Sequence, residues 1–160
     1  MIVKGDVVCQ WVAEKLRARY APGDTAVGWL SEGKLVAAIL YTDYTGTSIL
    51  MHSRVDDPKK VQREWLRAIF DYPFNQLGVK RVRGLVSSGN AQAIATNEHL
   101  GWLRESTPLA DYFPDGDGIV YYMRREDCRW LDRRPRRLTQ RPQPCFTNSS
   151  HMTQTASSLN

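Results

Sequence analysis

The spacing of apolar and polar residues changes several times along the chain, and each change delimits a predicted element. After Asp6, apolar side chains recur every three or four residues, with charged residues between them. This spacing is typical of a helix with one packed and one solvated face. Pro22 and Gly23 then interrupt the pattern, because proline removes a helix donor and glycine permits a turn. The pattern predicts a short strand over 1–4 and a helix over 6–20.

Three short runs rich in Val, Ile, Leu and Tyr come next, at 25–30, 35–41 and 47–55. These residue types favour the pleated surface of a strand. The connections at 31–34 and 42–46 each contain a glycine and have the length of a hairpin loop. The sequence therefore predicts an antiparallel meander of three strands.

The period then changes back to that of a helix. Asp57 and Pro58 are the residue types of a helix cap and a first helical position, and an apolar face continues to Tyr72. Pro73 should kink or end this helix because it has no N–H to donate. Gly78 is expected to close the segment as a left-handed cap.

A polar break, Ser87-Ser88-Gly89-Asn90, separates a predicted strand over 82–87 from a helix that ends at Leu100-Gly101. Asn90 can cap this helix. The first N–H groups of a helix have no partner within it, so such a break can hold the polar atoms of a ligand. We therefore expect the chemistry of the protein at this break. The remaining predicted elements are a strand after Trp102 through about Thr107 and a strand at 119–124, on either side of a turn-rich loop at 108–118.

The predicted order is β-α-βββ-α-β-α-ββ, without a repeat. A meander followed by two strand-to-helix units favours an α/β fold, with a mixed sheet and helices on both faces. The length of 160 residues suits a single domain. No run approaches the roughly 20 apolar residues of a membrane span, and the N-terminus lacks the apolar centre of a signal peptide. We expect a cytoplasmic protein without membrane contacts.

Charge divides the chain at about residue 132. Residues 1–132 hold 17 basic and 17 acidic residues, whereas 133–160 hold five arginines and no acidic residue. The final stretch is also rich in Pro, Gln, Ser and Thr, so we expect a domain over 1–132 and a disordered basic tail over 133–160. The run RRPRR at 133–137 could contact nucleic acid phosphates. The neutrality of 1–132 counts against nucleic acid binding as the main function.

The cysteines and histidines do not form a recognisable site. There are three of each, widely spaced and without a CxxC pair. An odd number of separated cysteines indicates neither a disulfide framework nor a zinc site. We expect no metal.

The order of elements, the segment SGNAQAIATNEHLGW at 88–102 and a final strand ending Tyr-Tyr-Met-Arg together resemble the GNAT acetyltransferase superfamily. The resemblance covers about residues 1–126 and looks closest to short acetyltransferase-like proteins of bacteriophages and prophages. It implies a GNAT-like sheet and transfer of an acetyl group from acetyl-CoA to an amine.

The resemblance also implies where acetyl-CoA would bind. Backbone groups of the strand that ends in Met51, His52 and Ser53 would line the pantetheine arm, where this strand splays from 82–87. Asn90 would lie near the arm. The start of the next helix would hold the pyrophosphate, although the family pattern Arg/Gln-x-x-Gly-x-Gly/Ala falls on 57–62 with both glycines absent. Lys59, Lys60 and Arg63 are expected to compensate for these glycines as point charges, and Gln62 is a further candidate for binding the cofactor. The alternative for the three cations is a solvated helix face.

The same resemblance directs attention to the catalytic groups. Many members carry a tyrosine three residues before the Leu-Gly pair, and here that position is Asn97, which cannot supply a proton. His52 is the candidate base that deprotonates the attacking amine, since its unperturbed pKa is about 6.5. Glu98 is the second catalytic candidate. The alternative for His52 is a packed or hydrogen-bonded strand residue.

We therefore expect an acetyl-CoA-dependent N-acetyltransferase in which the amine attacks the thioester directly. The alternative is a catalytically inactive GNAT-fold binding or structural protein, which the absent glycines and Asn97 favour. An enzyme predicts an open cleft between 47–55 and 82–87, whereas a binding module predicts a filled one. The sequence leaves open whether the acceptor is a small-molecule or a protein amine, and whether the chain forms a homodimer.

Overall fold

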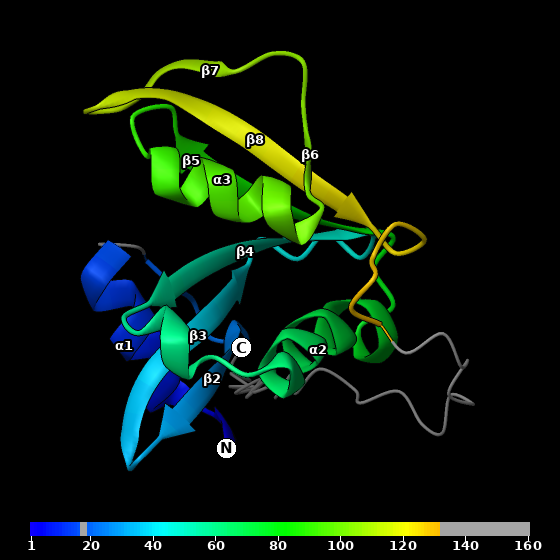
Figure 1. Cartoon of the computed structure of the whole chain (residues 1–160). Helices are drawn as coiled ribbons and strands as arrows, with labels where there is room; N and C mark the ends of the chain where they lie inside the picture. The colour runs from blue at the N-terminus through cyan, green and yellow to red at the C-terminus, as the bar shows by residue number, and fades with distance from the viewer. Residues whose placement is uncertain (17–18, 132–160) are drawn as a thin grey trace, which may run out of the picture.

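Eight strands form one mixed sheet in the computed structural model, which describes residues 1–16 and 19–131 (Figure 1). The strand order is β1-β2-β3-β4-β5-β8-β6, with β7 paired to β8. The strands are β1 Ile2–Lys4, β2 Thr25–Ser31, β3 Lys34–Thr42, β4 Ser48–Val55, β5 Arg81–Ser87, β6 Leu103–Arg104, β7 Leu109–Phe113 and β8 Gly116–Arg124. The helices are α1 Asp6–Leu16, α2 Arg63–Asp71 and α3 Ala91–Leu100, with a 3-10 turn η1 at Pro58–Lys60 and a π turn η2 at Tyr72–Gln76.

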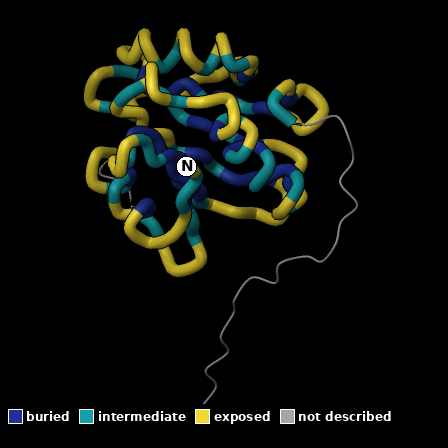
Figure 2. Tube along the Cα trace, turned by 60° about the horizontal axis from the view of Figure 1, so that its bottom comes forward, coloured by how far each residue is buried: buried dark blue, intermediate teal, exposed yellow. Residues whose placement is uncertain are grey.

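Alternating residues of the central strands cover two separate cores. Ala26, Ala38 and Leu40 pack against the buried face of α1. Their neighbours Val27 and Ile39 face the other way and pack with α2, and α3 covers the same face. Figure 2 shows the buried stretches in the middle of the molecule and the exposed ones around them. The predicted α/β architecture, with helices on both faces of a mixed sheet, is confirmed.

Two buried hydrogen bonds attach α2 to the sheet. The indole Nε1 of Trp65 donates to the carbonyl of Val27 over 3.2 Å, and the hydroxyl of Tyr41 donates to the carbonyl of Ile69 over 2.7 Å. In a continuous helix the carbonyl of Ile69 would accept from the residue four positions on, which is Pro73 and has no N–H. Tyr41 therefore supplies the donor that proline lacks, and α2 ends at Asp71 as the sequence predicts.

The meander and the two later strand-to-helix units agree with the predicted boundaries to within about two residues. Gly78 has the expected left-handed backbone, with φ of 72°. Two predictions for the later part of the chain were wrong. The helix expected from Pro58 is broken at Val61, which is extended (ψ 128°). The loop expected at 108–118 contains β7 and the start of β8, while β6 has two residues only.

The missed strand β7 has a physical explanation. Pairing to β8 begins at Leu109 and resumes at Phe113, with an irregularity between them and a left-handed backbone at Asp111 (φ 52°). The amide of Asp111 is held by the carboxylate of Asp117 over 2.9 Å. The edge of β8 thus supplies partners that turn-forming residues alone do not indicate.

No helix within residues 1–16 and 19–131 is long and apolar enough to cross a membrane. The first helix was predicted to run to Tyr20, and this was wrong: α1 ends at Leu16, and after residues 17 and 18, which lie outside the described residues, Arg19 and Tyr20 are not helical. The predicted tail at 133–160 lies wholly outside the described residues.

Candidate functional site

Strands β4 and β5 run parallel but pair over three residues only. Ser48, Ile49 and Leu50 pair with Arg81, Val82 and Arg83. Beyond Leu50 the two strands diverge, as Figure 1 shows between β4 and β5. Backbone groups on this edge of β4 are left without a strand partner, so they can bind the polar backbone of an elongated ligand.

Side chains along the divergent part of β4 become more exposed toward its end. Met51 is buried in the core at 7% exposure, next to Tyr41 on β3, so only its backbone is available to a ligand. His52 is half-buried and Ser53 is exposed, while Val55 is 40% exposed. On β5, buried Trp102 lies over Gly84. Beyond the paired residues, β4 therefore changes from a buried side chain at Met51 to an exposed one at Val55.

The start of α2 lies directly after β4 and carries no side-chain cap. Asp57, which was predicted to cap a helix from Pro58, caps only η1, where its carboxylate accepts from the amide of Lys59 over 3.2 Å. The indole of Trp29 donates to the carbonyl of Lys60 over 2.9 Å, and this bond accompanies the break at Val61. Gln62 then takes the cap position of α2 without a side-chain bond. First-turn amides of such a helix attract anions.

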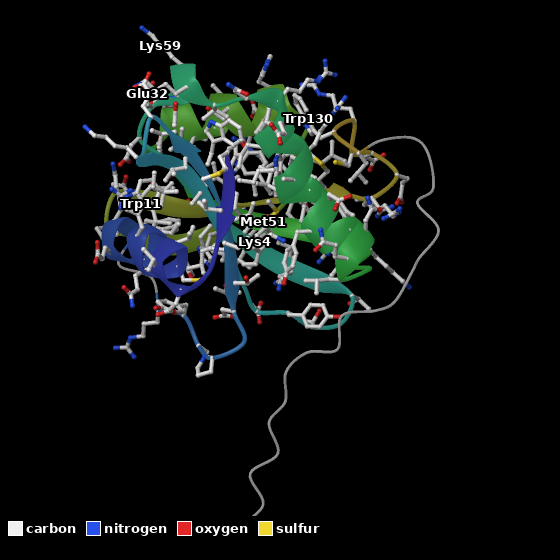
Figure 3. The ribbon with its side chains drawn as sticks, turned by 90° about the horizontal axis from the view of Figure 1, so that it is seen from below. Lys4, Trp11, Glu32, Met51, Lys59 and Trp130 are labelled. Atoms are coloured by element: carbon white, nitrogen blue, oxygen red, sulfur yellow. The ribbon has the colours of Figure 1, made fainter. Side chains whose placement is uncertain are left out.

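The three predicted cations do not all project freely from this start. Lys60 pairs with Glu32 of the β2–β3 turn over 2.7 Å, and this pair raises the pKa of Lys60 and lowers that of Glu32. Figure 3 shows Glu32 and Lys59 at the same edge of the molecule. Lys59 and Arg63 are exposed and have no carboxylate partner among the described residues. Two of the three cations therefore remain available to an anionic ligand.

The turn between β5 and α3, where the sequence predicts the chemistry, is largely closed by its own contacts. The amide of Ser88 donates to the carbonyl of Asp117 over 2.8 Å, and the amides of Gly89 and Asn90 donate to the hydroxyl and carbonyl of Ser87. Asn90 caps α3, as predicted, through Oδ1 and the amide of Ala93 over 3.0 Å. Most of this turn is thus bound internally, because the β7–β8 hairpin lies against it.

Asp115 and Gly89 allow the β7–β8 hairpin to lie against the turn between β5 and α3. The hydroxyl of Ser87 donates to the carboxylate of Asp115 over 2.8 Å. A Cβ on Gly89 would lie 2.7 Å from the carbonyl oxygen of Asp115, which is closer than side chains allow. Gly89 is therefore needed for the close approach of the hairpin.

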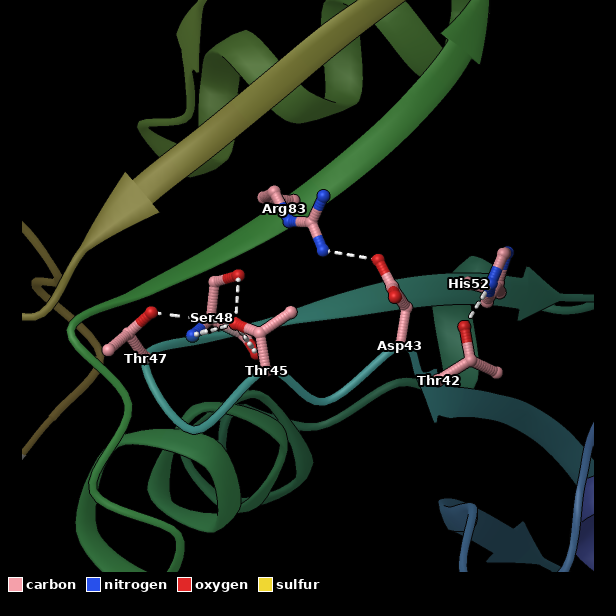
Figure 4. Close-up of polar contacts among 7 residues, drawn as sticks. All are labelled: Thr42, Asp43, Thr45, Thr47, Ser48, His52 and Arg83. Carbon is pink, nitrogen blue, oxygen red and sulfur yellow. Dashed lines mark hydrogen bonds and ion pairs between the residues drawn. The ribbon is translucent and has the colours of Figure 1, made fainter.

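A second polar group lies on the opposite face of the β4–β5 gap (Figure 4). His52 is opposite Leu40 on β3, so it points toward the α1 face, and its Nε2 lies 2.9 Å from the hydroxyl of Thr42. Burial lowers the pKa of His52 below its usual value, and the charge of Asp24 opposes this shift. A half-buried imidazole that is neutral at pH 7 can accept a proton.

Arg83 and Asp43 form an ion pair beside this histidine, on the same face of the sheet. Arg83 is opposite Leu50, the last paired residue of β4, so the ion pair marks the point where the strands diverge. The Nε atom of Arg83 is buried without a hydrogen-bond partner in the described chain. Sequence reasoning missed both residues, because their proximity depends on the parallel pairing.

Glu98, the second catalytic candidate, lies elsewhere. Its carboxylate accepts from the hydroxyl of Tyr121 over 3.2 Å and lies 3.8 Å from Nη2 of Arg104. Tyr121 and Arg104 belong to β8 and β6, and β5 separates these strands from β4. The structure therefore does not bring Glu98 and His52 to the same place.

The segment after β8 contributes residues that the sequence did not single out. Arg129 and Trp130, with Arg63 and Leu66 of α2, line an open hollow of about 480 Å³. The indole Nε1 of Trp130 donates to the carbonyl of Leu100 at the end of α3 over 3.1 Å. A lone tryptophan just before a polar tail carries no periodic signal, so only the fold reveals this hollow.

No metal cluster of three or more His, Cys, Asp or Glu side chains exists within residues 1–16 and 19–131. Cys9 and Cys128 are buried, and burial raises the pKa of both thiols, which disfavours the reactive thiolate.

Comparison with solved structures shows that several acetyltransferases have a similar fold. The ribosomal-protein-S18-alanine N-acetyltransferase from Escherichia coli is 18% identical, with 78% of this chain and 92% of that one covered and a TM-score of 0.57. Mutant forms of the spermidine/spermine N-acetyltransferase SpeG from Vibrio cholerae are 15% identical, with 74% and 75% covered and a TM-score of 0.56. An acetyltransferase of the GNAT family from Bacillus anthracis is 19% identical, with 73% and 72% covered and a TM-score of 0.53.

Sequence comparison gives no further assignment. Neither the models of known protein families nor the curated proteins contain a match to this chain. The structural neighbours nevertheless share one architecture with it, a mixed sheet in a single α/β domain. The chain therefore has the fold of the GNAT acetyltransferases.

Proposed function

We propose that the protein is an acetyl-CoA-dependent N-acetyltransferase. The observation that carries the proposal is the divergence of β4 from β5 after Leu50, which leaves backbone groups unpaired beside an uncapped helix start. Its structural neighbours are N-acetyltransferases, which supports an acetyltransferase function at a coarse level.

The residues at the α2 start fit an anionic ligand. Lys59 and Arg63 are free of carboxylates within the described chain, and the negative charge of Asp57 is directed to the amide of Lys59. In the proposed complex Lys59, Arg63 and the Gln62 amide bind the pyrophosphate, and Lys60 joins them when it leaves Glu32. Backbone groups of Met51 and Ser53 line the pantetheine arm. Asn90, whose Oδ1 is used by the cap, offers only its Nδ2 amide.

The proposed reaction joins the nitrogen of an amine to the carbonyl carbon of the acetyl thioester and breaks the bond from that carbon to sulfur. His52 takes the proton that the amine loses, because it is neutral at pH 7 and lies on the α1 face of β4, two residues beyond the last residue paired with β5. The thiolate takes its proton from water, since Asn97 offers no acid. His52 is preferred over Glu98, which is engaged with Tyr121 and Arg104.

Thermal unfolding with acetyl-CoA and with CoA tests the proposal first. A ligand that binds only the folded protein at 100 times its dissociation constant adds about 2.7 kcal/mol to the free energy of unfolding, visible as a raised melting temperature. Acetyl transfer is then measured with spermidine and with a peptide beginning in alanine, the acceptor types in the names of two neighbours. A melting temperature unchanged at millimolar acetyl-CoA would contradict the function.

A second candidate function is binding without catalysis. It is favoured by the absence of both loop glycines at 57–62, by Asn97, and by the internal contacts of the β5–α3 turn. Ligand-dependent stabilisation without acetyl transfer to any amine would support this candidate.

We also propose the boundary of the domain, its location in the cell and its partner. We place its end near residue 132, followed by the basic tail, and place the protein in the cytoplasm. The relation to short bacteriophage and prophage proteins rests on residues 88–102. The proposed partner is a small-molecule or protein amine.

A further inference from the structure

The guanidinium of Arg83 uses only part of its hydrogen-bonding capacity. Its Nη2 donates to the carboxylate of Asp43, which is its single hydrogen-bond partner among residues 1–16 and 19–131. Its Nε is buried and has no partner within the same residues. Nε and Nη2 lie on one edge of the group, and a guanidinium binds a carboxylate most strongly through two such parallel N–H donors. Asp43 therefore uses one donor of a pair that can hold a carboxylate.

Asp43 is the member of this ion pair that a ligand can displace. Its side chain is 58% exposed, against 26% for Arg83. It lies in the loop after β3 and has a left-handed backbone (φ 53°), which costs free energy in residues other than glycine. Exposed ion pairs contribute only about 0–1 kcal/mol to stability. A ligand carboxylate that takes the place of Asp43 and also satisfies the buried Nε would therefore be favoured.

Arg83 lies next to the candidate base on the same face of the sheet (Figure 4). It is opposite Leu50, and His52 is two residues further along β4. With about 4.8 Å between strands and about 3.3 Å per residue, the backbones of Arg83 and His52 are about 8 Å apart. A small molecule with an amine at one end and a carboxylate at the other fits between their side chains.

The same face continues beyond Arg83 as a partly exposed apolar surface. The helix α1 packs against β1 to β4, whereas Leu85 of β5 and Tyr112 of β7 lie beyond it, half-buried and exposed respectively. These two side chains meet over Gly118, where a Cβ would lie 3.0 Å from Cβ of Tyr112 and 3.1 Å from Cδ1 of Leu85. An apolar group of a ligand bound at Arg83 would cover this surface, which is favourable.

We infer that the acceptor is an apolar amino acid with a free carboxylate, which Arg83 binds in exchange for Asp43 while the amine faces His52. The inference rests on the proposed function, and it makes Arg83 a specificity-determining residue. Spermidine, the acceptor in the name of one structural neighbour, has no carboxylate and carries positive charges that Arg83 repels. It should therefore be a poor acceptor for this protein.

Calorimetric titration of the full chain tests the inference on the reaction product, independently of catalysis. N-acetyl-L-leucine and N-acetyl-L-leucinamide differ only in the carboxylate, and the acid should bind at least tenfold more tightly. Arg83→Gln should remove this preference and leave binding of the amide unchanged. Asp43→Asn should tighten binding of the acid severalfold, because the competing carboxylate is gone and Asn tolerates the same backbone. N-acetylglycine, without an apolar side chain, should bind about tenfold more weakly than N-acetyl-L-leucine.

Arg81→Gln is the matched control, because Arg81 lies on the same strand and face as Arg83 but pairs with Glu105 over 3.3 Å. Circular dichroism shows whether each variant is folded, and acetyl transfer to L-leucine and L-leucinamide is measured alongside. Equal binding of acid and amide, or a preference that persists in Arg83→Gln, would overturn the inference and leave the proposed function intact if any amine is acetylated. Binding of N-acetyl-L-leucine that depends on Arg83, without acetyl transfer, would support the carboxylate site and contradict the proposed enzyme.

Discussion

At the scale of single residues, His52 illustrates what burial does to a predicted catalytic group. The sequence indicates a histidine in a strand and leaves a packing role open. The structure shows a half-buried imidazole bound to Thr42, with a pKa lowered mainly by burial. Protonating it in the folded state therefore costs more than in the unfolded chain.

The first prediction concerns the pH dependence of stability. Because the folded pKa of His52 lies below its unfolded value of about 6.5, the unfolded chain binds more protons as pH falls below 6.5. The contribution of His52 to the free energy of unfolding is fully present above pH 6.5. It is lost as the pH falls from 6.5 through the lower folded pKa. The free energy of unfolding should therefore fall less steeply below pH 6.5 in His52→Gln than in the wild type, as measured by urea titration at several pH values. His99→Gln, at an exposed position, is the control. Identical slopes for His52→Gln and the wild type would contradict the assignment.

A second residue-scale prediction concerns Tyr41, which replaces the missing donor of Pro73. Tyr41→Phe should lower the free energy of unfolding by about 1–3 kcal/mol, because the buried carbonyl of Ile69 loses its partner. Chemical denaturation measures this change. Tyr72→Phe is the control, since its half-buried hydroxyl makes no hydrogen bond within the described chain, and it should change stability by much less. A Tyr41→Phe protein as stable as the wild type would show that water replaces the donor.

At the scale of elements, Asn90 in the turn before α3 has two proposed roles, and a substitution such as Asn90→Ala would remove both at once. Asn90 caps the helix, and the resemblance also places it near the pantetheine arm. Different atoms of the Asn90 side chain would serve the two roles. Oδ1 accepts from the amide of Ala93 as the cap, and Nδ2 is left to bind a ligand.

We predict that Asn90→Ala lowers the free energy of unfolding by about 1 kcal/mol without any ligand, because the cap is lost. Asn90→Ser should keep the cap and remove only the Nδ2 donor. If Nδ2 binds the arm, Asn90→Ser weakens acetyl-CoA binding at nearly unchanged stability, as calorimetry and thermal unfolding together will show. Wild-type affinity in Asn90→Ser would limit Asn90 to the cap.

At the scale of the whole molecule, the proposed sites all lie within residues 1–131, although the net charge of +5 resides in residues 133–160. Because screened charges act over about 10 Å at 0.1 M salt, the tail acts on ligands only where it lies close to them.

We predict that deletion of 133–160 leaves the melting temperature shift by acetyl-CoA within about one degree of the full chain. The same deletion should abolish any retention on a nucleic acid column at low salt, since residues 1–132 are neutral. Unchanged retention of the truncated chain would place nucleic acid binding in the domain.

The sequence by itself determined most of the elements. Apolar spacing located the meander, Pro73 located the end of α2, and Asn90 and Gly101 located both ends of α3. These features are local, because hydrophobic period, missing donors and caps act within a few residues.

Only the tertiary structure decided how the candidate site is assembled. Parallel pairing placed Arg83 and Asp43 beside His52, and the β7–β8 hairpin occupied the turn predicted to hold a ligand. Docking of the last segment beside α2 brought Trp130 to Arg63. These residues are far apart in the sequence and carry no shared period, so their chemistry arises from packing across the sheet, which local patterns do not encode.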